Sequence, residues 1–513
     1  MRKRQSNRRN RGERPVRVAG SITQSDWSPV TYVTPPTNFL STDAVEAIHD
    51  TALTILEEIG MKVLSADARA RYKAAGFTVD DTTEMVRFDR QGIEQAIATA
   101  PPSFPLHARN PERNLVIGGA NAVFSVTGGP VYCMDLENGR RRGTYEEMCN
   151  FIRLVQSLNV LHQEGGGGFE ALDLPSETRH LDLLYAQATL LDKNWMPWNI
   201  GARQTMDCLE MAAIMLETDL EGLREKPIFT GVINTNSPLQ LDIPMAEGLI
   251  TLAEYGQAAV VTPFTLSGAM APVTLAGALA QQHAEAMAGI ALTQIVRPGA
   301  PVVYGGFTSN VDMKTGSPAF GTPEYVQAAQ ASGQLARHLN LPFRSSNVTT
   351  ANTTDAQAAY ESMMSLWGAM SGGANLIMHA AGWLGGGLTA SFEKLILDAE
   401  MLQMMAAYNK PMEVDREALA MDAVRDVGPA GHYFGTAHTL ARYETAFYSP
   451  LVSNWDNFDA WQQAGSTTAE QRANTIWKQL LAEYEQPPID DGVDEALRDY
   501  RDRRKFEIHG RTA

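Results

Sequence analysis

The chain has 513 residues, of which 44% are hydrophobic and 20% are charged, and its formal net charge is −17. These values are ordinary for a globular protein that is large enough for more than one structural unit. The acidic balance argues against a nucleic-acid partner, and no apolar run reaches the ~18 residues that a membrane span requires.

The basic start of the chain is predicted to be a disordered tail. Residues 1–38 are rich in Arg, Ser, Thr and Pro, and "MRKRQSNRRNRGERPVR" carries eight basic residues against Glu13. A docking arm for an acidic partner is the alternative. No apolar core follows these residues, so they do not form a secretory signal, and three widely spaced cysteines suggest no disulfide framework. We therefore expect a cytoplasmic protein.

An N-terminal extension of helices and short strands is predicted for residues 39–120. Residues 41–60, "STDAVEAIHDTALTILEEIG", place apolar side chains at the three- and four-residue spacing of an amphipathic helix. A second helix is predicted to end at Pro101. Near the other end of the chain, residues 409–513 are predicted to form a helical appendage that lies against the body.

The central residues 121–408 alternate between apolar runs and helix-like segments. The runs are continuously apolar, which is typical of a parallel sheet covered by helices, and eight units are the number that closes a (β/α)8 TIM barrel. An open doubly wound sheet is the alternative, although it usually carries a dinucleotide fingerprint. The predicted strands cover residues 122–129, 160–168, 195–202, 227–237, 258–268, 301–307, 342–350 and 374–383.

The active site of such a barrel lies at the carboxyl ends of its strands, where aromatic and amide side chains recur. Aromatic faces bind cations, quaternary ammonium best of all, and a guanidinium binds a carboxylate. Trp198, Phe307 and Trp383 are therefore candidates for an aromatic cage, with Arg344 and His379 as carboxylate ligands. Ordinary core packing is the alternative for the tryptophans and His379, whereas a buried arginine requires a partner.

Several common sites are absent from the sequence. It contains no G-x-x-x-x-G-K-[ST] loop, no H-E-x-x-H and no paired Cys/His spacing, so we expect no metal bound by this chain. It also lacks the D-x-H-x-x-G stretch of a protein that carries its own corrinoid.

Long segments of the chain resemble the trimethylamine methyltransferase family over about residues 40 to 490. The resemblance rests on "GGPVYCMDLENGRRRGTYEEMCNFIRL", "FTLSGAMAPVTLAGALAQQHAE", "DMKTGSPAFGTPE", "LIMHAAGWLGGGLTASFEKLILDAE" and "GHYFGTAHTLARYETAFYSPL". It implies a TIM barrel that transfers an amine methyl group to the corrinoid (cobalamin) of a separate, cognate protein. The archaeal trimethylamine enzymes contain pyrrolysine, and this chain has only standard residues. It therefore resembles the branch that acts on quaternary amines such as glycine betaine.

The family-like segments add Tyr132 and Tyr325 to the substrate-binding candidates. The residues expected to face the corrinoid protein at the mouth are Glu164, Gly166, Asn199, Asn234 and Gly386. No catalytic residue is assigned, because a quaternary amine leaves as a neutral amine and needs no general acid.

The sequence thus predicts a methyltransferase that moves a methyl group from a betaine to Co(I). The alternatives are a trimethylamine-type methyltransferase, a betaine-binding barrel without turnover, and a phosphate-binding barrel lyase. A homo-oligomer is compatible with the composition.

Overall fold

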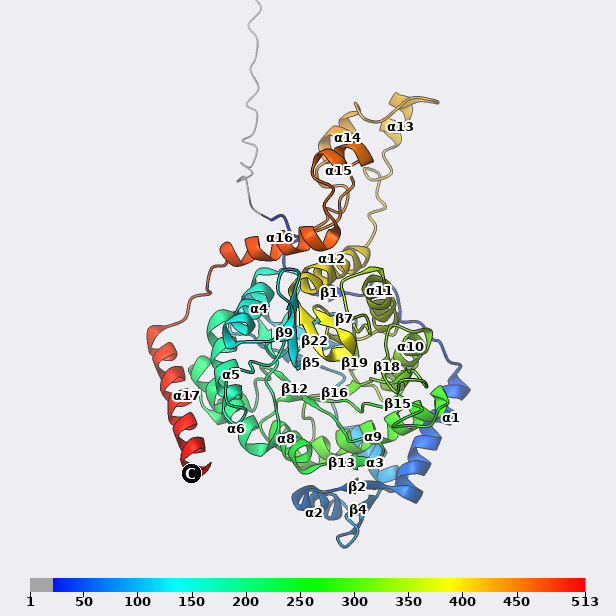
Figure 1. Ribbon diagram of the computed structural model, residues 1–513. Helices are drawn as coiled ribbons and strands as arrows, with labels where there is room; N and C mark the ends of the chain where they lie inside the picture. The colour runs from blue at the N-terminus through cyan, green and yellow to red at the C-terminus, as the bar shows by residue number, and fades with distance from the viewer. Residues whose placement is uncertain (1–21, 513) are drawn as a thin grey trace, which may run out of the picture.

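The computed structural model describes residues 22–512, in which parallel strands form the centre of an α/β fold (Figure 1). Each strand lies within or overlaps one of the predicted apolar runs. The eight strands are β7 (Asn121–Phe124), β10 (Gln163–Glu164), β11 (Asn194–Trp195), β12 (Thr230–Ile233), β14 (Ala258–Val261), β16 (Val302–Gly305), β19 (Phe343–Ser346) and β20 (Leu376–Met378).

A helix follows each of these strands and covers the outside of the sheet. Helix starts carry the expected caps: the Thr322 hydroxyl accepts a hydrogen bond from the Tyr325 N–H, and Pro323 occupies the first turn. The covering helices are α4 (Tyr145–Ser157), α5 (Arg179–Leu190), α6 (Gly201–Met215), α8 (Ile243–Glu254), α9 (Leu275–Val296), α10 (Pro323–His338), α11 (Ala356–Ser371) and α12 (Phe392–Tyr408), with the short α7 (Leu220–Leu223) after α6.

The strand ladder is not closed, which corrects the prediction of one closed barrel. Six of the eight strands pair continuously in the order β7-β20-β19-β16-β14-β12, while β10 and β11 form a separate parallel pair. Single bridges, Ser125 to Gln163 and Trp195 to Phe229, join that pair to its neighbours. The ladder is short here because Gly166 leaves the extended conformation with a φ of 111° and Pro197 has no N–H to donate.

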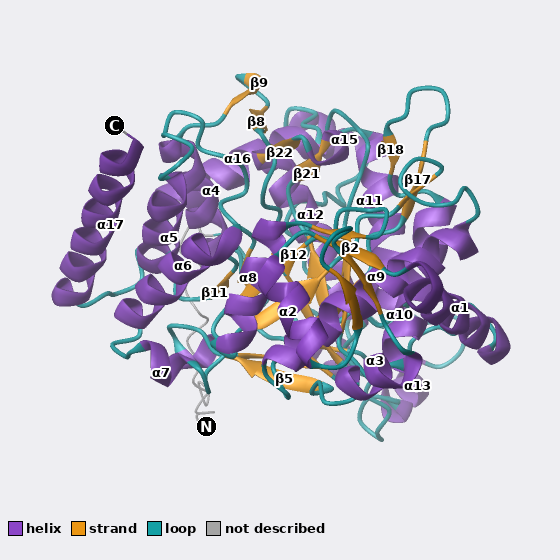
Figure 2. Cartoon of the chain, turned by 90° about the horizontal axis from the view of Figure 1, so that it is seen from below, coloured by secondary structure: helices purple, strands orange, loops and turns teal. Residues whose placement is uncertain are grey.

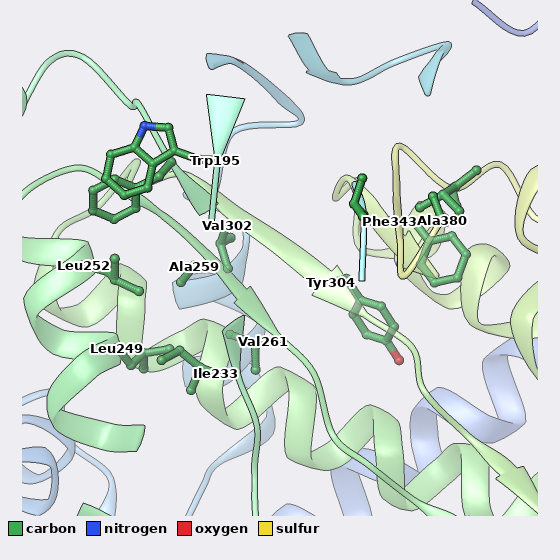
Figure 3. Close-up of a cluster of buried hydrophobic side chains, with 14 of the residues drawn as sticks. Trp195, Ile233, Leu249, Leu252, Ala259, Val261, Val302, Tyr304, Phe343 and Ala380 are labelled. Atoms are coloured by element: carbon green, nitrogen blue, oxygen red, sulfur yellow. The ribbon is translucent and has the colours of Figure 1, made fainter. Parts of the chain in front are cut away.

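Side chains alternate between two cores along the strands. Ala259, Val261 and Tyr304 point outward to the helices, where Leu249 and Leu252 of α8 face the sheet in Figure 3. The intervening residues point into the space that the strands surround. This inner cluster consists of Val123, Met196, Ala258, Val260, Val303, Leu376 and Met378, together with Phe104, Leu106, Leu115 and Ile117 from the β5–β6 hairpin. The hairpin therefore packs against the inner core.

The segment before the sheet is more ordered than predicted. Residues 1–21 lie outside the described part, but residues 22–38 do not form a disordered tail. β1 pairs antiparallel with β7, and the Tyr32 hydroxyl donates to the Ala374 carbonyl at 2.7 Å. The elements before β7 are β1 (Val30–Thr31), α1 (Thr42–Thr54), the π-helical Ile55–Ile59, β2 (Met61–Val63), α2 (Ala66–Ala74), β3 (Thr78–Asp80), β4 (Met85–Arg87), α3 (Arg90–Ile97), β5 (Ser103–Leu106), the 3-10 turn Pro111–Arg113 and β6 (Leu115–Gly118).

The loops after β7, β12, β14, β16 and β20 contain short strands that the sequence analysis did not predict (Figure 2). The strands β8 and β9 form a hairpin, and β22 pairs with β8. These additions are β8 (Tyr132–Asp135), β9 (Gly139–Arg142), β13 (Gln240–Leu241), β15 (Leu266–Ser267), β17 (Ser309–Val311), β18 (Pro318–Ala319), β21 (Trp383–Leu384), the 3-10 turn Gly385–Gly387 and β22 (Thr389–Ser391).

The C-terminal region divides into two parts. Helices α16 (Ala469–Ala482) and α17 (Asp491–Thr512) lie against the body, whereas residues 410–467 project away from it (Figure 1). The projecting part contains α13 (Met421–Val427), α14 (Ala437–Arg442) and α15 (Phe458–Gln463). In residues 22–512, every helix is too short or too polar to cross a bilayer.

Candidate active site

Arg344 is buried inside the ring of strands, and no carboxylate of residues 22–512 forms an ion pair with it. Its register places it level with Leu376 of β20, which points inward, and strand alternation therefore points Arg344 inward too. The side chain is 2% exposed, and its Nε and Nη1 atoms have no hydrogen-bond partner within the described chain. Burial lowers the pKa of Arg344 to about 10, which leaves it cationic at neutral pH. Burying a guanidinium without a partner is costly in free energy unless a ligand supplies the missing charge and hydrogen bonds.

Aromatic rings surround this arginine. The Arg344 Cζ atom lies 4.8 Å from the ring centroid of Phe307, and Phe307 stacks on Phe320 at 5.6 Å. Tyr325 belongs to the same cluster, its hydroxyl donates to the Ser346 carbonyl at 3.0 Å, and burial raises its pKa to about 12. The buried cluster consists of Phe307, Phe320, Tyr325, Val348 and Trp383, with Phe264 packed against it.

His379 connects this cluster to the open part of the site. Its ring centroid lies 4.3 Å from that of Trp383 and 5.8 Å from that of Phe307, and its Nδ1 atom lies 3.2 Å from the Ser346 hydroxyl. The backbone of His379 has a φ of 51°, a conformation that a non-glycine residue rarely adopts. Burial, and secondarily the charge of Arg344, hold the pKa of His379 well below its usual value. The imidazole is therefore neutral at physiological pH.

A cavity of about 460 Å³ opens beside His379 at the carboxyl ends of β10, β11, β12 and β20. Its lining includes Trp198, which was a candidate for the aromatic cage, and Asn199 and Asn234, which were candidates for the mouth. Both side-chain polar atoms of Asn199 are buried without a hydrogen-bond partner in the described residues, and Gly231 makes room for this amide. Like Arg344, Asn199 has hydrogen-bonding capacity left for a polar ligand.

The glycine run after β10 shapes one wall of this cavity. A Cβ atom at Gly166 would lie 2.9 Å from Nε1 of Trp198, so the indole is held against a backbone that has no side chain there. Glu164 does not face the mouth. It shares its register with Trp195, which points to the outer helices, and its carboxylate accepts hydrogen bonds from the N–H groups of Gly166 and Gly167. Its role is to shape the loop.

Of the two remaining predicted residues, Tyr132 lies away from the cluster, whereas Gly386 lies beside Trp383, whose indole N–H donates to the same Thr349 carbonyl as the Gly386 N–H. Tyr132 is on the β8–β9 hairpin, where the Arg140 guanidinium covers its ring at 3.7 Å, so this face is not available to a substrate. Gly386 lies in the turn after β21 and donates its N–H to the Thr349 carbonyl at 3.1 Å. The structure therefore brings together Phe307, Tyr325, Arg344, His379 and Trp383, places Trp198, Asn199 and Asn234 on the neighbouring cavity, and separates Tyr132 from both.

The sequence analysis left out three residues that build this site. Phe264 and Phe320 extend the aromatic cluster, and Gln282 of α9 holds the loop after β16. The Gln282 side-chain oxygen accepts from the Phe307 N–H at 3.2 Å and from the Thr308 hydroxyl at 2.7 Å. The position of Phe264 just after β14 was a usable signal, whereas a helical glutamine that reaches over a strand end gives none.

An α/β body with an aromatic- and amide-lined cavity at the carboxyl ends of its parallel strands is typical of an enzyme that acts on a small molecule. The chain belongs to the trimethylamine methyltransferase (MTTB) family, whose model matches residues 4–509. Within the described chain, no three His, Cys, Asp or Glu side chains come together as metal ligands would.

The chain is similar to several named proteins. It is 37% identical to the glycine betaine methyltransferase of Desulfitobacterium hafniense strain Y51, over 92% of this chain and 98% of that protein. It is 29% identical to a trimethylamine methyltransferase of another strain of the same species, over 89% and 92%. It is also similar to the crystal structure of a hydroxylamine complex of MtmB, at 12% identity, a TM-score of 0.49, and coverage of 89% and 93%, which is too distant to inform the site.

Proposed function

We propose that this protein transfers a methyl group from a betaine, with glycine betaine as the leading candidate, to the Co(I) of a separate corrinoid protein. The observation that carries the proposal is the buried Arg344, whose unpaired nitrogens lie among aromatic rings. A betaine would place its carboxylate at the guanidinium and its ammonium against the rings. The higher identity to a glycine betaine methyltransferase than to a trimethylamine methyltransferase supports the same substrate class.

The chemistry of this substrate fits the side chains present. Co(I) attacks a methyl carbon, the C–N bond breaks, and the nitrogen keeps the electron pair, so a neutral tertiary amine leaves and cobalt becomes methyl-Co(III). No proton is transferred. Among the described residues that line the cavity, the one carboxylate is Glu170, and it is paired with Arg179. His379 is neutral, and the other histidine that lines the cavity, His180, has its Nε2 atom 3.0 Å from the Asp207 carboxylate. A quaternary amine, which needs no proton to leave, suits these side chains.

The residues of this chain would act by holding and shielding the substrate. Arg344 would fix the carboxylate and thereby aim the ammonium toward the mouth, and the rings of Phe307 and Trp383 would exclude water from the reacting carbon. Orienting two reactants and removing solvent are the main sources of acceleration that such a displacement requires. The order of strands around the ring supports a (β/α)8 barrel as the parent fold of this arrangement.

Single-turnover methyl transfer tests the proposed function. The purified chain would be mixed with a reduced corrinoid protein or free cob(I)alamin, and with glycine betaine, trimethylamine or choline. The visible spectrum of the corrinoid should change to that of methyl-Co(III) with glycine betaine, and one equivalent of dimethylglycine should form. Faster transfer from trimethylamine would favour the methylamine alternative. Tight betaine binding without transfer to either acceptor would indicate a binding protein.

A further inference from the structure

The projecting residues 410–467, here called the arm, have almost no core of their own. Ala423 and Val452 are the only buried residues among these 58 positions, and α13, α14 and α15 are each shorter than eight residues. Short helices gain little from backbone hydrogen bonds alone, and ordering a chain costs conformational entropy that burial must offset. An ordered arm with so little burial therefore needs a second surface.

The arm also exposes a large apolar area. Side chains that are at least two-thirds exposed include Met412 at 87%, Phe434 at 85%, Phe447 at 83%, Trp455 at 70% and Phe458 at 68%. With ~150–250 Å² for each aromatic residue, the four aromatic side chains alone leave roughly 500 Å² or more in water. This sum is comparable with the ~300–600 Å² of the largest apolar patch on an ordinary monomer, and a standard interface buries ~800 Å² on each partner.

A complementary apolar groove lies where the arm joins the body. It has a volume of about 950 Å³ between α11, α12 and the returning residues 452–472. Tyr360 and Met364 of α11 and Met404 of α12 line the groove, with exposures of 59%, 38% and 45%. The exposed Trp367 and Tyr408 lie about one turn further along the same two helices. The carboxylate of Glu400 in α12 anchors the base of the arm by accepting the N–H groups of Leu451 and Val452.

We propose that the occupant of this groove is the arm of a second copy of this chain, in a two-fold dimer with two reciprocal arm-to-groove contacts. One molecule carries both a projecting apolar arm and an apolar groove on the same side, which makes the surface self-complementary, as an isologous interface must be. Each contact of this kind would cover the arm of one copy and the groove of the other. Figure 1 shows the arm projecting sideways, beyond α12 and α16, rather than across the ring of strands where a methyl acceptor has to approach.

Sedimentation equilibrium of the full chain over a wide concentration range tests this arrangement. The wild-type chain should be a dimer. Phe434→Glu with Phe447→Glu in the arm, and Tyr360→Glu in the groove, should each weaken self-association at least about tenfold, because charges are costly in the centre of an interface. Phe506→Glu is the matched control, since Phe506 is 80% exposed on α17, away from both surfaces. Circular dichroism melts would show that every variant is folded.

Mixing the two variants distinguishes the arm-to-groove contact from any other dimer. A mixed pair combines the intact arm of the groove variant with the intact groove of the arm variant, so the mixture should associate more tightly than either variant alone. A monomeric wild type, or unchanged self-association in both variants, would overturn the proposal. So would arm variants that stay dimeric but lose binding to the corrinoid protein, because the arm would then be a docking site for that partner.

Discussion

At the residue scale, Arg344 is the side chain on which the substrate assignment depends. Arg344→Ala should weaken glycine betaine binding by about 2–5 kcal/mol, the cost of removing one partner from a buried charge pair. Tetramethylammonium has no carboxylate, so its binding should change much less. Isothermal titration of both ligands against wild type and variant measures the difference. Because Arg344 is 2% exposed, the alanine variant leaves a space in which a small ligand still fits. The carboxylate of that ligand would have no guanidinium to bind.

Arg344→Met is the matched control for the shape of this side chain, since it keeps most of the stem and removes the charge. It should lose betaine affinity as the alanine variant does while restoring packing against Phe307. Equal losses for the two ligands in both variants would make Arg344 a structural residue, and the betaine assignment would lose its main support.

A site residue could be predicted from the sequence when its place along a strand determines where its side chain lies. The proximity of Phe307, Arg344 and His379 could be predicted because they lie on or just beyond strand ends, and the fold brings strand ends together. Glu164 was misplaced because strand register, which the sequence does not reveal, turns it outward toward α5. Tyr132 was misplaced because its ring is covered by Arg140, a contact across a hairpin that apolar periodicity does not predict.

At the element scale, two buried carboxylates help to dock α17: Asp182, which pairs with Lys505 at 2.6 Å, and Asp207. Asp207 of α6 accepts hydrogen bonds from Tyr500 at 2.7 Å and Arg504 at 2.9 Å, and its other oxygen lies 3.0 Å from His180. Burial by itself would raise the pKa of Asp207, but hydrogen bonds from His180, Arg504 and Tyr500 outweigh it and lower the pKa to about 2. The stabilisation is therefore complete above the unfolded value of about 4 and is lost as the pH falls toward 2.

Asp207→Asn should release α17 and cost about 3 kcal/mol, because Arg504 stays buried after losing a charged partner. Amide exchange of residues 491–512 should accelerate, while the strands stay protected. Asp502→Asn is the control on the same helix, because that carboxylate is 64% exposed and pairs only with a neighbour on α17. Unchanged exchange in Asp207→Asn would mean that the remaining contacts, such as the Asp182–Lys505 pair, are enough to hold the helix.

The elements themselves divide into those that periodicity predicts and those that it does not. The eight strands and their helices were predicted because each must bury a long apolar face, which leaves a clear pattern. The hairpin β8–β9 was missed because "YCMD" and "GRRR" pair through backbone hydrogen bonds, with polar side chains between them. The separation of β10 and β11 from the continuous ladder was not predicted, because an apolar run does not reveal that each strand is only two residues long.

At the scale of the whole molecule, buried histidines should make the fold sensitive to acid. His162 is fully buried, accepts the Phe124 N–H at Nδ1, and therefore donates from Nε2 to the Ser28 carbonyl, which ties the N-terminal segment to the sheet. Burial, partly opposed by the bond to Ser28, lowers its pKa to about 4. The pKa values of His283 and His379 are also well below the usual value, because both are buried.

A histidine whose folded pKa lies below its unfolded value of about 6.5 stabilises the fold fully above that pH, and the stabilisation is lost as the pH falls toward the folded value. For His162 the loss between about pH 6.5 and about pH 4 is on the order of 3 kcal/mol. Calorimetric melting temperatures should therefore fall between about pH 7 and about pH 5. His162→Gln keeps an acceptor and a donor but cannot titrate, so its melting temperature should fall less steeply than that of the wild type. His432→Gln, on the exposed arm, should keep the wild-type slope. If His162→Gln kept it as well, the acid sensitivity would arise elsewhere, and the bond between His162 and Ser28 would contribute packing alone.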